Sequence, residues 1–303
     1  MDQWEREYDA RGGGERRIDP SDGVAYTKQE YLDFLGVEVG EAAWAVAEVS
    51  PVRGSSQRGG GATAPVVRDA ASMQPAQPFP YLCVCDFEAT CEEDISFHEY
   101  THEIIEFPVV VIDLSNGGAV LREFHSFVRP TENATLSPFC KRLTGITQEQ
   151  VDRAPTLTEV LYQFEEWRLA LGLAYTESEK NFAFGTDGPW DLRYFLHGEC
   201  TRKGIAKLPY FDKWCNLKEL FSDFYKVGPC KVEAMLKLQG MEFEGRLHSG
   251  IDDTRNIARI AARMREDGAT IYVSEVLPKS MRSGGVFASR TVPFSKYTQS
   301  VEW

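Results

Sequence analysis

The sequence of 303 residues has no long hydrophobic run. No apolar stretch approaches the roughly 18 residues that cross a bilayer, so we expect neither a membrane-spanning helix nor a membrane partner. The opening stretch MDQWEREYDARGGGERR also lacks the apolar core of a secretory signal peptide. With 43% hydrophobic and 26% charged residues, the composition is typical of a soluble globular protein.

Paired cysteines are lacking as well. The seven cysteines make an odd number and none stands in C-x-x-C spacing, which argues against a disulfide framework. Cys83 and Cys85 alternate within an apolar run, as residues of a strand do. We therefore expect reduced thiols and a cytoplasmic or nuclear location.

Positive charge is outnumbered by negative charge: 33 Lys and Arg residues stand against 46 Asp and Glu residues, and the formal net charge is −13. This balance argues against a protein that wraps nucleic acid through bulk electrostatics. It does not exclude an enzyme of nucleic acid, because carboxylates that hold cations count as negative here but are neutralised once the cations bind. Residues 276–303 are net basic, whereas the rest of the chain is net acidic.

Composition divides the chain into four parts. Residues 1–50 have apolar residues near helical spacing and predict a short helical or partly disordered segment, a candidate site for a protein partner. Residues 51–80 are rich in Gly, Pro, Ser and Ala and predict a flexible linker. The regular patterns of a folded domain occupy residues 81–275, and residues 276–303 form a tail.

Periodicity within the folded region predicts a mixed α/β domain with a five-stranded sheet flanked by helices. Three successive antiparallel strands come first, the second and third joined by the turn N-G-G, and strand–helix units follow. The strands are expected at 81–90, 102–114, 119–130 and 181–187, and in the stretch that begins at 210. The last helix is expected from about Ser249 to the D-G at 267–268.

The first predicted strand ends in two acids. In extended backbone Asp86 and Glu88 point to the same side, where they repel each other unless cations lie between them. Hard divalent ions such as Mg²⁺ or Mn²⁺ prefer carboxylate oxygens. The same D-x-E pattern also occurs at ordinary solvent-facing strand edges, so by itself it does not decide between the two.

Two more acidic stretches lie at strand and helix ends. TDGPWD at 186–191 follows a strand and offers Asp187 or Asp191, and HSGIDD at 248–253 places His248 before a helix and Asp253 inside it. Helix capping is the alternative explanation for each. Together they supply four carboxylates and a histidine. That set fits two-metal hydrolysis of a phosphodiester, with one ion activating water, the other stabilising the leaving oxygen, and the histidine acting as general base.

In this order the motifs identify a family resemblance. The chain resembles the DEDDh 3′–5′ exonucleases of the ribonuclease H-like fold, within them the Eri-type branch that trims RNA 3′ ends. The resemblance covers about residues 81–275. It is carried by DFEATCE (86–92), HEIIEFPVV (102–110), FVRP (127–130), LSPFCKRLTGITQEQVDRA (136–154), TDGPWDL (186–192) and HSGIDDTRNIARIAARM (248–264).

The resemblance implies a role for each acidic residue. It assigns the metal ligands to Asp86, Glu88, Asp191 and Asp253, and the general base to His248. Asp86 would bridge two Mg²⁺ ions, for which Mn²⁺ is a substitute. Glu88 and Asp253 would complete one site, and Asp191 would reach the second ion directly or through water.

The resemblance also implies a substrate. It predicts a 3′–5′ exoribonuclease that releases nucleoside 5′-monophosphates from RNA with a free 3′ end, such as structured or small RNA or the 3′ tails of rRNA or mRNA. Phe87 and Trp190 would lie near the terminal nucleotide, where stacking on a base contributes about 1–3 kcal/mol. Packing in the core is the alternative for both rings.

Three other functions remain open at this point. A DNA 3′–5′ exonuclease would share the chemistry, since contact with the 2′-OH is what separates the two substrates. A non-catalytic RNA-binding subunit would share the fold. A zinc peptidase would explain HEYTH at 98–102, which matches H-E-x-x-H. The β-branched residues that follow, together with Pro108, predict a strand there and not the helix that a zinc peptidase requires.

Overall fold

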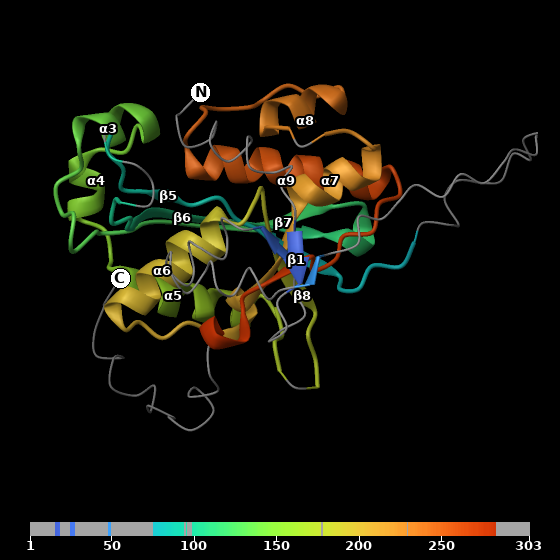
Figure 1. Cartoon of the computed structure of the whole chain (residues 1–303), viewed down its shortest axis with the longest axis horizontal. Helices are drawn as coiled ribbons and strands as arrows, with labels where there is room; N and C mark the ends of the chain where they lie inside the picture. The colour runs from blue at the N-terminus through green and yellow to red at the C-terminus, as the bar shows by residue number, and fades with distance from the viewer. Residues whose placement is uncertain are drawn as a thin grey trace, which may run out of the picture.

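The computed structural model in Figure 1 describes residues 75–93, 95, 99–176, 178–228 and 230–282, and three short strands nearer the N-terminus. These strands are β1 (Arg16–Ile18), β2 (Ala25–Thr27) and β3 (Glu48–Val49), which pair in an antiparallel sheet of order β2-β1-β3. These strands lie within residues 1–50, for which a short helical or partly disordered segment was predicted. The rest of residues 1–50, most of the linker and residues 283–303 lie outside the described residues.

A seven-stranded mixed sheet forms the centre of the folded domain. Its strands are β4 (Tyr81–Val84), β5 (Glu88–Ala89), β6 (Ile104–Asp113), β7 (Ala119–Phe127), β8 (Phe182–Thr186), β9 (Lys213–Asn216) and β10 (Glu275–Val276). β6 pairs antiparallel with β4, β5 and β7; β8 runs parallel to β4 and β9; β10 pairs antiparallel with β9. The five predicted strands are confirmed, although the first is divided into β4 and β5, and β10 is a short addition.

The predicted strand at 81–90 is interrupted. β4 and β5 both pair with one edge of β6. The other edge is occupied by β7, which pairs with residues 106–113 of β6, including those that pair with β4 and with Glu88. Between β4 and β5 lie residues 85–87, which belong to neither strand, although the Cys85 amide still donates to the carbonyl of Gly185 in β8 at 3.0 Å. Asp86 thus sits in a break of the sheet, with Glu88 just beyond it.

Helices cover both faces of the sheet (Figure 1). α7, α8 and α9 lie on one face, α5, η3 and α6 pack on the other, and α3 and α4 lie beside the end of the sheet that contains β5. The helices are α3 (Pro138–Thr144), α4 (Gln148–Asp152), α5 (Leu157–Ala170), the π-helix η3 (Trp190–Leu196), α6 (His197–Lys203), α7 (Leu217–Tyr225), α8 (Val232–Leu238) and α9 (Gly250–Glu266), with 3₁₀ turns η2 (Leu114–Asn116), η4 (Pro209–Asp212) and η5 (Lys279–Met281).

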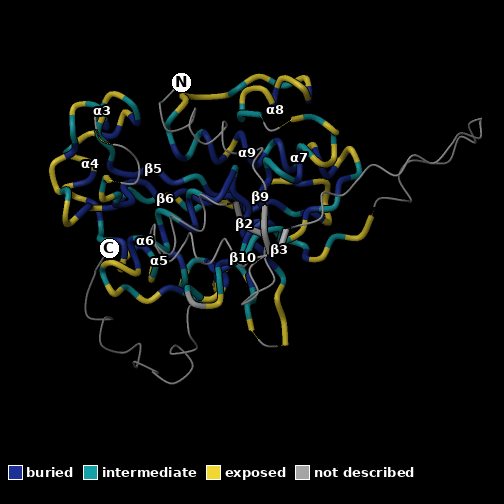
Figure 2. The backbone as a smooth tube through the Cα atoms, in the orientation of Figure 1, coloured by how far each residue is buried: buried dark blue, intermediate teal, exposed yellow. Residues whose placement is uncertain are grey.

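The core is divided by the sheet into two layers. Along β6, Val109 and Val111 face a layer rich in aromatic rings, while Val110 and Ile112 face the aliphatic layer under α9. This alternation follows from the two-residue period of a strand. Because both faces are covered, the sequence of β6 is apolar almost throughout, and Figure 2 shows the centre of the sheet as buried.

The folded domain extends past 81–275 at both ends. The Gln77 side chain donates to the carbonyl of Ala269 at 3.1 Å and accepts from the amide of Ile271 at 2.9 Å. Phe79 and Leu277 are both buried in the core. The described end of the predicted linker is therefore part of the domain. Among the described residues, none of the helices is long and apolar enough to span a membrane.

The turn between β6 and β7 yields a stability prediction. Gly117 and Gly118 both have positive φ, +63° and +80°. A Cβ on Gly117 would meet open space, whereas a Cβ on Gly118 would lie 2.5 Å from the Cβ of Ala262 in α9. We expect Gly118→Ala to lower the free energy of unfolding by about 2–4 kcal/mol, from left-handed strain plus overpacking, and Gly117→Ala by only about 1–2 kcal/mol.

Urea denaturation of both variants measures this difference. Equal losses for the two would show that the contact between the turn and α9 contributes nothing beyond the backbone conformation.

Candidate active site

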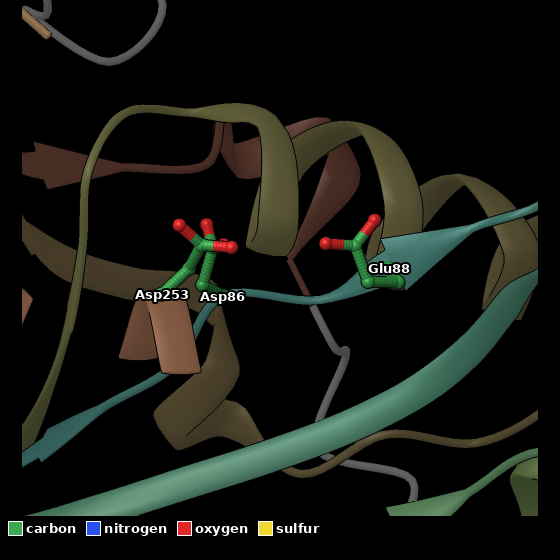
Figure 3. Close-up of side chains that lie close together, drawn as sticks. All are labelled: Asp86, Glu88 and Asp253. Atoms are coloured by element: carbon green, nitrogen blue, oxygen red, sulfur yellow. The ribbon is translucent and has the colours of Figure 1, made fainter. Parts of the chain in front are cut away.

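Three acidic side chains from two distant parts of the chain meet at the break between β4 and β5. Asp86 lies in the break, Glu88 starts β5, and Asp253 is in the first turn of α9. One carboxylate oxygen from each lies within 4.8 Å of the others. Figure 3 shows the three carboxylates projecting to the same side of the chain. The structure therefore brings together three of the four predicted metal ligands.

Crowding disturbs the protonation of these acids. Loss of solvent raises the pKa of Asp86 and Glu88, and the negative charges of Asp191 and Asp253 raise it further. The pKa of Asp253 rises to about 7, again chiefly through burial. A divalent cation would offset this repulsion, and an all-oxygen set of carboxylates is the donor set that hard cations prefer. The residues present thus fit such an ion.

Asp191, the fourth predicted ligand, lies next to this cluster but is bound differently. It is buried in the first turn of η3, and its Oδ1 accepts a hydrogen bond of 2.6 Å from the backbone amide of Phe87. That bond ties η3 to the residue between Asp86 and Glu88. Burial raises the pKa of Asp191 to about 7. Asp187 pairs instead with Lys218, at 3.2 Å.

His248 lies two residues before α9 and is half-exposed. Its φ is +59°, a left-handed conformation uncommon for a residue other than glycine. The backbone amides of His248 and Ser249 hydrogen-bond to the carboxylate of Asp253, the latter at 3.1 Å. The loop that carries the predicted base is therefore attached directly to a predicted metal ligand.

Sequence reasoning missed Glu106, which anchors α9. Its buried carboxylate accepts from the amides of Gly250 at 3.0 Å and Ile251 at 3.2 Å, and it pairs with His125 Nε2 at 2.7 Å. A Cβ on Gly250 would lie 2.8 Å from the carbonyl of Asp86, so glycine permits the close approach. The available signal was a charged residue inside an otherwise apolar strand.

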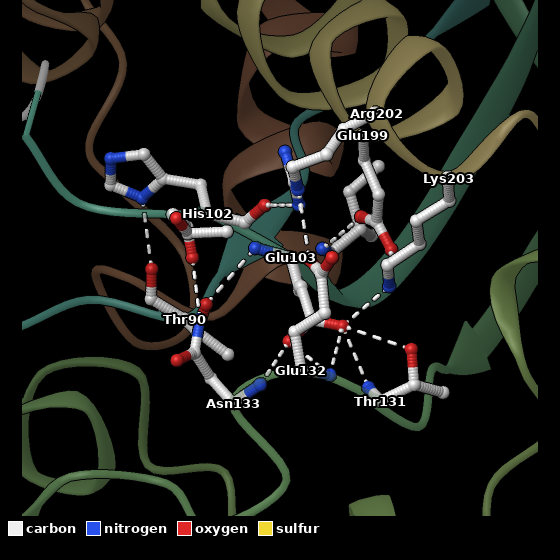
Figure 4. Close-up of polar contacts among 11 residues, drawn as sticks. Thr90, His102, Glu103, Thr131, Glu132, Asn133, Glu199, Arg202 and Lys203 are labelled. Carbon is white, nitrogen blue, oxygen red and sulfur yellow. Dashed lines mark hydrogen bonds and ion pairs between the residues drawn. The ribbon is translucent and has the colours of Figure 1, made fainter.

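The start of β6 is held by a buried hydrogen-bond network around Glu103, shown in Figure 4. Its carboxylate accepts from the amides of Thr131 at 2.6 Å and Glu132 at 3.0 Å, and from Lys203 Nζ. Burial would raise the pKa of Glu103, but these bonds, with one from the Asn133 amide, lower it overall. The network explains the first acid of HEIIEF, Glu103, as a structural residue.

The described part of HEYTH, residues 99–102, lies beside this network. His98 is outside the described residues, and His102 Nδ1 contacts the carbonyl of Thr90 at 2.9 Å. The described residues 99–103 are not helical, and the strand β6 follows them. The helix that a zinc peptidase motif requires does not form across the described part of this stretch.

The two predicted nucleotide-stacking rings differ in exposure. Phe87 is only 4% exposed, and its ring stacks on Phe107 with 4.5 Å between centroids. Its side chain therefore belongs to the core, while its backbone amide serves the site. Trp190 is half-buried and lies against Tyr194 with 4.8 Å between centroids. Stacking of Trp190 on a base stays a prediction.

Comparison with known sequences matches this site to a family. A family model described as an exonuclease, RNase T, matches residues 83–261. The human protein named 3′–5′ exoribonuclease 1 is 42% identical over 199 residues, which cover 65% of this chain and 56% of the relative. The Drosophila melanogaster 3′–5′ exonuclease Snipper is 38% identical over 211 residues, covering 66% and 75%. The chain thus spans little more than half the length of its human relative.

Solved structures agree with the sequence matches. The nuclease domain of 3′hExo, described as a DEDDh family member bound to rAMP, is 41% identical with a TM-score of 0.63, covering 67% of this chain and all of that one. Cell-death related nuclease 4 is 31% identical with a TM-score of 0.61, covering 66% and 69%. The family match spans more than half of the chain and contains every acid of the site. The chain therefore belongs to the RNase T exonuclease family and shares the ribonuclease H-like fold of its DEDDh members.

Proposed function

We propose that this protein is a divalent-metal-dependent 3′–5′ exoribonuclease that shortens RNA with a free 3′ end and releases nucleoside 5′-monophosphates. The convergence of Asp86, Glu88 and Asp253 beside His248 carries the proposal. Relatives named exoribonucleases and the neighbour bound to rAMP favour RNA over DNA as substrate. Structured or small RNA and the 3′ tails of rRNA or mRNA are the candidate substrates.

The carboxylates account for the metal requirement. Asp86, Glu88 and Asp253 would hold one Mg²⁺, and Asp86 and Asp191 would hold a second, with Mn²⁺ as a substitute. Once bound, such ions supply Lewis-acid stabilisation of the charge that develops on the reacting phosphodiester. Hydrogen bonds from backbone amides to Asp191 and Asp253 keep these carboxylates oriented for that role.

His248 would act as the general base. It would accept the proton of the attacking water, while the Asp253 carboxylate, bonded to the His248 amide, keeps the loop beside the acids. Trp190, at the start of the helix that carries Asp191, would hold the terminal base by stacking. The base of the 3′ nucleotide would thus be bound without being selected.

Two further proposals concern the setting of the enzyme. All seven cysteines are free thiols, which supports a reducing compartment, the cytoplasm or the nucleus. We also propose that the N-terminal segment, residues 1–50, binds a protein partner.

A labelling experiment tests the function directly. RNA and DNA of one sequence, labelled at the 5′ or 3′ end, are incubated with the protein and Mg²⁺ or EDTA. We expect 3′-labelled RNA to release its label at once as a mononucleotide, 5′-labelled RNA to shorten stepwise, and EDTA to stop both. DNA degraded at the same rate would contradict RNA selectivity, and endonucleolytic fragments would contradict the polarity.

Replacing Asp86 tests the metal site. Asp86→Asn should reduce nuclease activity to background while the protein stays folded, because one cation-binding carboxylate is lost. Mg²⁺ should raise the melting temperature of the wild type but not of the variant. The control is Asp113→Asn, which replaces an acid outside the site. It should keep the wild-type nuclease activity and the rise in melting temperature with Mg²⁺. If Asp86→Asn degrades RNA at the wild-type rate, the proposed two-metal site is wrong.

Asp86→Asn should also change how the stability of the protein depends on pH when EDTA has removed divalent cations. Because folding raises the carboxyl pKa values, the native state holds more protons than the unfolded state, and stability falls as pH rises. For Asp253 the decline spans the range from 3.8 to about 7. Asp86→Asn should flatten that decline, which thermal melts across this range would measure.

His248→Ala should lower activity about 10²–10⁴-fold, less completely than Asp86→Asn, since the cation-binding carboxylates remain. A base must be unprotonated, so the acid limb of the wild-type pH–rate profile should weaken in the variant. Rates measured at saturating Mg²⁺ from acidic to alkaline pH provide the check. An unchanged profile would speak against the base assignment.

A further inference from the structure

Arg246 connects two elements that approach each other only in the folded protein. It lies in the loop before α9, two residues ahead of His248. Its Nη2 donates to the carbonyls of Arg142 at 2.9 Å and Leu143 at 2.7 Å, and its Nη1 donates to the carbonyl of Thr144. These are the last three residues of α3. Carbonyls at a helix C-terminus lack partners within the helix and carry partial negative charge, so a cation is well suited to them.

The end of α3 leaves room for this guanidinium. Gly145 follows the helix with φ +71°, and a Cβ there would lie 2.5 Å from Arg246 Nη1. The glycine therefore serves two purposes, ending the helix in the left-handed conformation and admitting the arginine.

On its other side, Arg246 organises the loop that carries His248. Its backbone amide donates to Asp252 Oδ2 at 3.0 Å, and its carbonyl accepts from the Ser249 amide at 3.3 Å. Its Nη1 also lies 3.4 Å from the carbonyl of His248. The left-handed conformation of His248 is costly for a non-glycine residue and persists only where surrounding contacts impose it. Arg246 supplies contacts on both sides of that residue.

The helix that Arg246 holds is itself fixed to the metal-ligand strand. Ser137, the N-cap of α3, donates through Oγ to the carbonyl of Cys91 at 2.8 Å. Cys140 Sγ lies 3.8 Å from the carbonyl of Ala89, the residue after Glu88. A continuous path thus runs from Glu88 through α3 and Arg246 to His248.

We propose that Arg246 is a positioning residue for the general base, fixing the His248 loop relative to Glu88 through the C-terminus of α3. This rests on the proposed role of His248. Arg246 is exposed, so contact with an RNA phosphate is the rival role. That role would appear in KM, since a phosphate contact is made in the bound ground state, whereas a misplaced base lowers kcat.

A double-mutant cycle of Arg246→Ala and His248→Ala tests the proposal. Arg246→Ala should lower kcat about 10- to 100-fold and leave KM within roughly threefold of the wild type. In the His248→Ala background it should change kcat by less than about twofold, since no base is left to position. Arg259→Ala is the matched control, because Arg259 also donates to a carbonyl of this loop, Glu242, at 3.0 Å, but away from His248. Its kcat should match the wild type.

A second readout does not depend on activity. Amide hydrogen exchange of the metal-free protein should accelerate at residues 246–250 in Arg246→Ala and not in Arg259→Ala. If Arg246→Ala fails to fold, Arg246→Lys keeps the positive charge at the end of α3 but replaces the guanidinium with a single ammonium group. It should show an intermediate loss of kcat.

Each remaining outcome overturns the proposal. Arg246 does not act through His248 if the losses of kcat in the double-mutant cycle are additive, or if Arg246→Ala raises KM alone. The same conclusion follows if Arg246→Ala keeps the wild-type kcat, or if amide exchange at residues 246–250 is unchanged. Failure of the proposed function has a different signature: the wild type would not degrade RNA, or His248→Ala would match it. The arginine proposal fails alone when the wild type is active and His248→Ala is impaired.

Discussion

Mutual repulsion among four carboxylates is the constraint around which this domain is arranged. Asp86, Glu88, Asp191 and Asp253 come from three separate stretches of the chain, and burial raises the pKa of each. Such a cluster is unfavourable by itself, so the surrounding fold must impose it. It does so with backbone amides that bond Asp191 and Asp253, and with a sheet buried on both faces that prevents the strands from separating.

β6 is the element that joins these parts. It pairs with β4 and β5 on one edge, setting the break in which Asp86 lies, and Glu106 stands opposite Glu88 in the register. The carboxylate of Glu106 then holds the first amides of α9 and so places Asp253. One strand therefore determines the positions of the proposed metal ligands, Asp86 and Glu88 beside it and Asp253 in α9. A buried acidic side chain at this position is tolerated because both of its oxygens take part in hydrogen bonds.

The motifs that the sequence made visible are those with local causes. The N-G-G turn, the D-F-E at a strand end and the start of the last helix near Ser249 each follow from backbone conformation or periodicity over a few residues, and the structure confirms them. Less visible were the break after β4, the inclusion of Gln77 in the domain and the burial of the Phe87 ring. Each of these depends on a partner more than ten residues away, which no local pattern contains.

The sequence by itself determined the fold class and the five principal strands, because alternation and turn residues are properties of neighbouring residues. The order of its motifs along the chain also indicated, by resemblance, the family to which the site belongs. Only the tertiary structure decided how the acids meet and what supports them. Glu106 of β6 reaches the start of α9, which lies 144 positions later in the chain, and Arg246 reaches the end of α3 about a hundred positions earlier in the chain. Such contacts come from packing of elements, and a glutamate or arginine destined for them looks in sequence like any other charged residue.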